Sequence, residues 1–146
     1  MRRWLIAVCL AGATALSGCV VASPDDDTYR DAAASTLASA AGELATVREM
    51  VDLLDRDRIP RPAVVAQLRY SEKTLSAATD SFTSLDPPSS EDALADRSSR
   101  LLDDAGTAMT SARLTVHRAE TGSYARVVAE LDAVVTDLQR LEGSVS

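Results

Sequence analysis

The sequence predicts an all-α protein, an antiparallel up-down-up-down four-helix bundle with coiled-coil-like packing. In four successive segments, apolar residues recur at steps of three and four residues, which is the spacing of one helix face. Short breaks containing Pro or Gly separate these segments, and no segment shows the alternation typical of a strand. Because short connections make consecutive helices antiparallel, the four apolar stripes can be buried only against each other.

The first element is a targeting segment over residues 1–18. Met1-Arg2-Arg3 is a short positive region, and the apolar stretch from Trp4 to Leu16 has the length of a signal-peptide core. This stretch is too short to span a bilayer comfortably. It ends in Leu16-Ser17-Gly18-Cys19, which places a leucine and two small residues before a cysteine thiol.

These residues resemble the signal peptide and lipobox of bacterial lipoproteins, and the resemblance covers residues 1–19 only. It implies that a signal peptidase recognises Leu16, Ser17 and Gly18, and that Cys19 becomes the acylated N-terminus. Two or three acyl chains, palmitate among them, would anchor the protein stably on the extracytoplasmic face of the cell membrane. An uncleaved anchor or an ordinary secretory signal is the alternative. The Ala- and Arg-rich, Lys-poor composition is typical of high-GC bacteria and points to an actinobacterial source.

The rest of the chain carries no family resemblance, but its cysteine count and charge are informative. Cys9 lies in the predicted leader, so Cys19 is the only cysteine left after cleavage and no disulfide can form within the mature chain. Cleavage also removes Arg2 and Arg3, which leaves 13 basic and 22 acidic residues and a net charge of −9. An acidic domain repels phosphate backbones, so we expect no nucleic-acid partner.

A short tether over residues 19–25 leads into the predicted bundle, which spans 26–143. The run Asp25-Asp26-Asp27 is interpreted as a helix N-terminus, where carboxylates meet free amides and the positive end of the helix dipole. A cation site is the alternative interpretation. The first helix is predicted over 26–56, with a seam formed by Leu37, Ala40, Leu44, Val47, Val51 and Leu54.

Pro60 and Pro62 interrupt the pattern, and the second helix is predicted over 62–85, with Pro62 in its first turn. The seam of this helix contains Val64, Leu68, Ser71, Leu75, Ala78, Phe82 and Leu85. Pro87-Pro88 ends it. Ser89, with Asp92 three residues later, resembles a capping box at the start of the next helix.

The third and fourth helices are predicted over 90–119 and 123–142, separated by Thr121-Gly122-Ser123. The third has a small, Ala-rich face that lets a neighbour approach closely, made by Leu94, Leu101, Leu102, Ala105, Ala108, Met109, Ala112, Thr115 and Val116. The fourth has the strongest apolar stripe, made by Tyr124, Val127, Val128, Leu131, Val134, Val135, Leu138 and Leu141.

The sequence offers little catalytic or metal-binding chemistry. His117 is the only histidine, which is too few for a di-iron or zinc site, and we expect it to be partly exposed near a helix end. Asp52, Asp55 and Asp57 lack the ligand spacing of a calcium loop, and Asp103-Asp104 is interpreted in the same way, as solvated charge. No nucleophile elbow or phosphate loop is present. We therefore expect no enzyme activity, no metal and no cofactor.

Two functions remain in consideration. The leading hypothesis is a lipid-anchored bundle that acts by protein-protein contact at the cell envelope, and it predicts an exposed apolar groove or patch. The alternative is a ligand-binding or sensory four-helix module, which predicts a cavity with converging polar groups, with candidates Tyr29, Tyr70, Tyr124 and Arg69.

Overall fold

The computed structural model describes residues 24–145, apart from the side chain of Thr121. The predicted signal peptide and the lipobox residues Leu16, Ser17, Gly18 and Cys19 lie outside this range. The described chain contains no strand and four α-helices: α1 (Asp26–Asp55), α2 (Arg61–Thr83), α3 (Asp92–Arg118) and α4 (Tyr124–Val145). The 3₁₀ turn η1 (Ser89–Glu91) precedes α3, and η2 (Thr121–Ser123) precedes α4. The predicted all-α class is confirmed.

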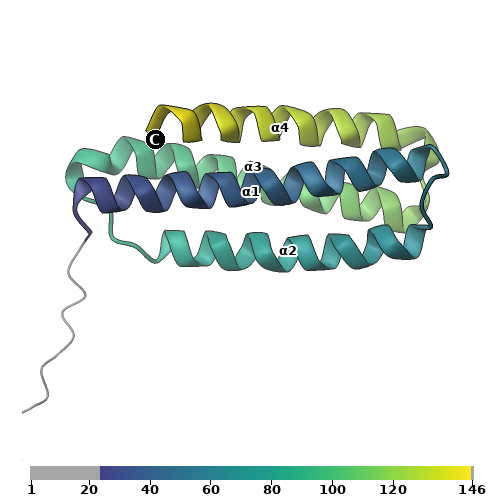
Figure 1. Cartoon of the computed structure of the whole chain (residues 1–146), viewed down its shortest axis with the longest axis horizontal. Helices are drawn as coiled ribbons and strands as arrows, with labels where there is room; N and C mark the ends of the chain where they lie inside the picture. Colours follow the sequence, from purple (N-terminus) through teal and green to yellow (C-terminus); the bar gives the residue numbers. More distant parts are fainter. Residues whose placement is uncertain (1–23, 146) are drawn as a thin grey trace, which may run out of the picture.

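The four helices lie along one long axis, and each runs opposite to its neighbour in the sequence (Figure 1). Helix α1 packs against α2 and α4, and α3 closes the bundle by packing against the same two helices. The contact between α1 and α4 is the most extensive of the four neighbour contacts, and that between α2 and α3 is the least extensive. The predicted bundle is thus confirmed, with its weakest seam between α2 and α3.

The start of α1 follows from the aspartate run. A carboxylate oxygen of Asp25 accepts a hydrogen bond from the backbone amide of Thr28 at 2.8 Å, which satisfies one of the free donors of the first turn. Asp26 and Asp27 occupy the first turn, where the helix dipole favours negative charge. The interpretation of this run as a helix N-terminus is confirmed.

Two helices end in a left-handed residue that is not glycine. Asp57, with φ 54°, follows α1, and the amide of Arg58 donates a hydrogen bond to the carbonyl of Leu53 at 2.9 Å. Ala119, with φ 57°, follows α3, and the amide of Glu120 donates back into the last turn in the same manner. This 6→1 bond is that of a Schellman motif. It explains why α1 and α3 each end one residue before the predicted bound.

The connection between α2 and α3 differs from the prediction. Helix α2 starts one residue early, at Arg61, and stops at Thr83 instead of 85, because the chain must leave the helical region before Pro87. The predicted capping box is wrong: Ser89 makes no capping hydrogen bond and belongs to η1, so α3 begins at Asp92 instead of 90. The next residue, Ser90, donates a hydrogen bond to the carboxylate of Asp26 on α1 at 2.8 Å.

Helix α4 is displaced towards the C-terminus relative to the prediction. It begins at Tyr124 instead of 123, because Thr121–Ser123 form the 3₁₀ turn η2. It continues to Val145, past residue 142, the predicted end of the helix, and residue 143, the predicted end of the bundle. The side chain of Val145 packs against the core. Gly143 therefore lies within the helix and does not end it.

The core follows the predicted seams closely. All six seam residues of α1 are buried, and most of those predicted in the other helices are buried too. The exceptions are only partly buried: Ala78, Leu85, Leu101, Val128 and Val134. The prediction missed five buried residues outside the seams, namely Tyr29, Ala33, Ala41, Glu91 and Ser98. A straight helix drifts from the seven-residue repeat, so the buried stripe widens over a 30-residue helix such as α1.

Long-range contacts join the start of α1 to the α2–α3 connection. The guanidinium of Arg30 donates a hydrogen bond to Glu91 at 2.6 Å, and the Glu91 side chain is only 6% exposed. The ring of Tyr29 packs on that of Phe82, with centroids 5.4 Å apart. Burial, and next the charge of Glu91, raise the pKa of the Tyr29 hydroxyl. These contacts fix the end of the bundle at which the chain enters.

Candidate functional site

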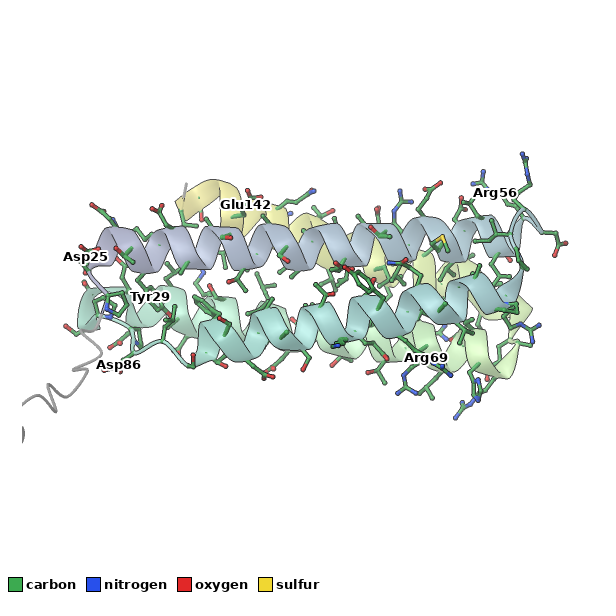
Figure 2. All side chains as sticks on the ribbon, turned by 60° about the horizontal axis from the view of Figure 1, so that its bottom comes forward. Asp25, Tyr29, Arg56, Arg69, Asp86 and Glu142 are labelled. Carbon is green, nitrogen blue, oxygen red and sulfur yellow. The ribbon has the colours of Figure 1, made fainter. Side chains whose placement is uncertain are left out.

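The four residues considered for ligand binding do not converge. Tyr29 is buried in the first turn of α1, whereas Tyr124 is buried at the start of α4, at the other end of the bundle. Tyr70 is 64% exposed on α2 and lines no described hollow. Figure 2 shows Tyr29 at one end of the bundle and Arg69 well along its length. Arg69 lines a small hollow between α2 and α3.

The acidic runs and His117 are surface features. Asp25 is a helix cap, and the hydrogen bonds that it accepts from Thr28 hold the pKa of its carboxyl below the ordinary value. Asp52 accepts a hydrogen bond from the Arg56 guanidinium at 2.9 Å, one helical turn away. His117 is exposed in the last turn of α3, as predicted. Across residues 24–145, no group of three or more potential metal ligands is placed to hold a metal ion.

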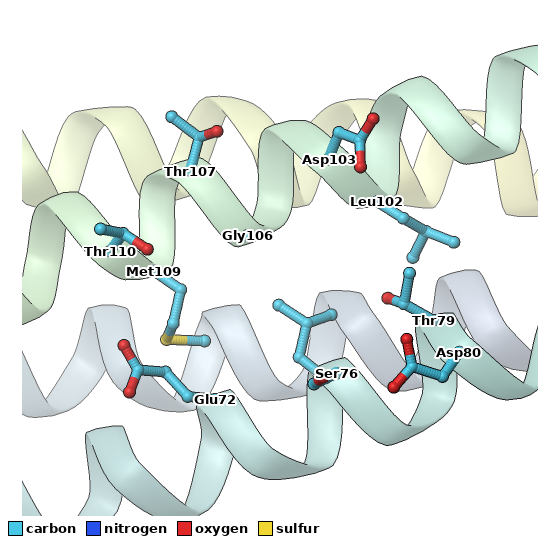
Figure 3. Close-up of a pocket in the computed structure, with 11 residues that line it drawn as sticks. Glu72, Ser76, Thr79, Asp80, Leu102, Asp103, Gly106, Thr107, Met109 and Thr110 are labelled. Atoms are coloured by element: carbon cyan, nitrogen blue, oxygen red, sulfur yellow. The ribbon is translucent and has the colours of Figure 1, made fainter.

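A groove of about 680 Å³ lies between α2 and α3, the neighbouring helices with the least extensive contact. We call it the α2–α3 groove. Figure 3 shows Glu72 and Asp80 of α2 reaching towards α3, and Met109 and Leu102 of α3 extending into the space between the helices. The residues that line it are Glu72, Leu75, Ser76, Thr79, Asp80, Leu102, Asp103, Gly106, Thr107, Met109 and Thr110.

Small side chains create this groove. Gly106 contributes no side chain, and an added Cβ there would meet no atom within 4 Å. Short hydroxyl-bearing residues line much of the remaining rim. The floor is made of Leu75, Leu102 and Met109, each less than 5% exposed because they belong to the core. The groove therefore has an apolar floor and a polar rim, which is the usual composition of a binding cleft.

The charge of the groove is entirely negative. Its three ionisable residues are carboxylates, and no basic residue lines it. Asp80 and Asp103 are exposed and make no ion pair with a described side chain. Glu72 is the exception, because it accepts a hydrogen bond from the Nε of Arg113 at 2.7 Å. The groove can thus attract cationic groups while offering an apolar surface beneath them.

Between the same two helices, the charge of the lining residues becomes positive towards the start of α2 and the end of α3. A hollow of about 220 Å³, lined by Val65, Leu68, Arg69, Arg113 and His117, lies between the start of α2 and the end of α3. We call it the α2–α3 hollow. A third depression, of about 570 Å³ between α3 and α4, has mixed charge and is lined by Arg97, Arg100, Leu101, Asp104, Asp137, Arg140, Leu141 and Ser144.

The exposed apolar patch that the leading hypothesis predicts is not found among the described residues. In the described chain, the large hydrophobic residues that are exposed are Tyr70 and Leu114, on different helices. The groove floor provides apolar surface at the bottom of a polar cleft instead. No helix within residues 24–145 is long and apolar enough to cross a membrane.

Sequence reasoning missed both features of the α2–α3 seam. The available signal was Gly106 in the middle of a predicted helix, followed by Thr107 and Thr110. Comparisons of the chain with protein-family models, with curated proteins and with solved structures find no match.

Proposed function

We propose that this protein is a lipid-anchored, extracytoplasmic helical bundle that acts without catalysis, by binding a protein partner at the cell envelope through the α2–α3 groove. The single observation that carries the proposal is the groove itself. It has a volume of about 680 Å³, its floor is apolar, and the charges that line it are the three carboxylates of Glu72, Asp80 and Asp103.

The anchor is the first part of the proposal. It rests on the match of Leu16-Ser17-Gly18-Cys19 to the lipobox. Helix α1 begins at Asp26, so six residues lie between Cys19 and its start, and the two positions can be at most about 25 Å apart. The end of the bundle that holds Asp25 would then lie close to the membrane. The groove, along the side of the bundle, would be within reach of a juxtamembrane segment of a partner.

The partner's chemistry is the second part of the proposal. Charge complementarity favours a segment that carries Lys or Arg, because the groove has three carboxylates and no basic residue. The buried floor of Leu75, Leu102 and Met109 favours apolar side chains on the same segment. We therefore expect a basic amphipathic segment of an envelope protein to bind here.

The groove test uses two glycine substitutions. Gly106→Leu would fill the groove, and Gly42→Leu is a matched control on α1, because neither position has a neighbouring atom within 4 Å of an added Cβ. We expect proximity labelling from the anchored protein to lose a specific neighbour in Gly106→Leu and to retain it in Gly42→Leu. An identical set of labelled proteins in both variants would contradict the proposal.

The anchor test uses Cys19→Ala. We expect this variant to remain an unprocessed precursor or to leave the membrane fraction, and the wild-type protein to incorporate labelled palmitate. A Cys19→Ala protein with a processed N-terminus that stays in the membrane fraction would overturn the anchoring mechanism. This outcome would leave the groove test unaffected.

A ligand-binding or sensory module is the second candidate function. One observation favours it, the α2–α3 hollow, where Arg69 lies beside Arg113 and His117. The two functions can be separated, because the hollow and the groove are lined by different residues.

A further inference from the structure

We propose that the α2–α3 hollow is a binding site for a phosphate group. The proposal does not depend on the proposed partner or on the lipid anchor, because the residues that line the hollow differ from those that line the groove and none belongs to residues 1–23. It rests on the charge, the shape and the unused hydrogen-bond donors of the five residues that line the hollow.

The first observation is the clustering of positive charge in an acidic protein. The predicted mature chain has a net charge of −9, yet no acidic residue lines this hollow. Arg69, Arg113 and His117 come from two helices and border a space of only about 220 Å³. Glu72 offsets the charge of Arg113 from the groove side, whereas Arg69 has no acidic partner, and a bound anion would offset the remaining positive charge.

The second observation is the supply of free donors. Arg69 has no ion-pair or hydrogen-bond partner among the described side chains. Arg113 uses its Nε to donate to Glu72, which orients the guanidinium and leaves the Nη donors available. His117 can also donate from its ring and has no described partner. Guanidinium groups suit phosphate, because two parallel N–H groups can bind two oxygens.

The third observation is the apolar floor. Leu68 is 1% exposed and Val65 is partly buried, so the hollow is backed by the core of the bundle. Charge interactions strengthen where water is partly excluded. A phosphate carries a charge of about −1.5 to −2 at pH 7 and has more acceptor oxygens than a carboxylate, so it can bind Arg69 and the Nη groups of Arg113 together.

The phosphate could belong to a soluble small molecule or to a lipid headgroup, and the experiment separates these sources. Purified protein is titrated with inorganic phosphate at fixed pH and ionic strength, with chloride as the balancing anion, while backbone amide shifts are followed. In parallel, binding to vesicles of phosphatidylglycerol or of phosphatidylcholine is measured by sedimentation. Inorganic phosphate that competes with vesicle binding would identify a lipid source, and phosphate binding without vesicle binding would identify a soluble ligand.

Three variants give the proposal its test. Arg69→Gln should weaken phosphate binding about tenfold or more, because it removes a charge-assisted contact. The phosphate affinity of Arg69→Lys should lie between those of Arg69→Gln and the wild type, because lysine keeps the charge but lacks the two parallel N–H groups of guanidinium. Arg58→Gln is the control: it removes the same charge from the α1–α2 turn, outside the hollow, and should change the affinity less than twofold.

Saturable shifts confined to residues 65–69 and 113–117, with this order of affinities, are the expected result. Equal effects of Arg69→Gln and Arg58→Gln would overturn the proposal, because they would show diffuse attraction to a charged surface. The proposal would also be overturned if neither inorganic phosphate nor phosphatidylglycerol vesicles bound saturably. Each variant's melting curve verifies that the bundle is folded, which is expected because both arginines are exposed.

Discussion

The Nε of Arg113 on α3 donates a hydrogen bond to the carboxylate of Glu72 on α2 at 2.7 Å, at the boundary between two hollows of opposite charge. Glu72 lines the acidic groove and Arg113 lines the basic hollow. The pair therefore joins α2 and α3 where their packing is least extensive, and it separates the two sites that we propose.

Replacing the Glu72 carboxylate with a neutral amide should change the affinity of the hollow for phosphate more than the stability of the fold. Both side chains are partly exposed, so Glu72→Gln should lower the free energy of unfolding by less than about 1 kcal/mol. It should also raise the affinity for inorganic phosphate, because a negative charge beside the hollow is lost while the amide oxygen can still accept from the Nε of Arg113. Urea denaturation and phosphate titration test the two statements, and a lowered phosphate affinity would contradict the second.

The same substitution to glycine should have opposite effects at two alanines. Ala119 has φ 57°, which an L-residue other than glycine adopts at a cost of about 1 kcal/mol. Ala119→Gly should therefore raise the free energy of unfolding by about that amount. Ala66→Gly, at an exposed position inside α2, should lower it by about 1 kcal/mol. Destabilisation by both substitutions in urea denaturation would argue against the left-handed helix end.

Two hydroxyl groups are buried in the core. The Oγ of Ser98 and the hydroxyl of Tyr124 have no hydrogen-bond partner among residues 24–145. Ser98→Ala and Tyr124→Phe should each leave the free energy of unfolding unchanged or raise it by about 1 kcal/mol, because no hydrogen bond is lost. Tyr124→Ala should instead lower it by about 3–5 kcal/mol by creating a cavity. A loss above about 1 kcal/mol in Tyr124→Phe would show that its hydroxyl is bonded in solution.

The cap of α1 should make stability depend on acid pH. Hydrogen bonds from Thr28 lower the pKa of Asp25, so its ionised form favours the folded state above about pH 3.8, the ordinary value for an aspartate. This contribution is lost as the pH falls through the lowered pKa of the folded state. Asp25→Asn keeps an acceptor that does not titrate, so the gap in melting temperature between wild type and variant should shrink on acidification. A gap that is constant from about pH 6 to 2 would contradict the assignment.

The helices and their buried faces could be predicted because they depend on local spacing. The seam of α1, from Leu37 to Leu54, is buried as predicted. The capping box at Ser89 failed because a 3₁₀ turn occupies that segment, and a short pattern cannot distinguish the two. Left-handed helix ends at Asp57 and Ala119 escaped prediction because the usual signal, a glycine, is absent.

The interactions between helices could not be predicted, because they depend on how the bundle closes. Glu91 is buried beside Arg30, 61 residues away in the sequence, and an acidic residue in a connection gives no local sign of burial. Arg69 and Arg113 are 44 positions apart by their residue numbers, and only the antiparallel pairing of α2 with α3 places both at one hollow. The groove depends on the lack of a side chain at Gly106, and this lack leaves a gap only because α2 packs on the opposite side.

Site-specific photocrosslinking in living cells tests the central claim most directly. A photoreactive residue is placed at Thr107, which lines the groove, or at Thr136, an exposed threonine on α4. The account predicts one dominant adduct from Thr107, attached to a Lys- or Arg-rich segment of an envelope protein. This adduct should be absent from Thr136 and lost when Asp80→Lys and Asp103→Lys are combined. No adduct from Thr107, or the same adducts from both positions, would contradict the claim that the groove binds a partner.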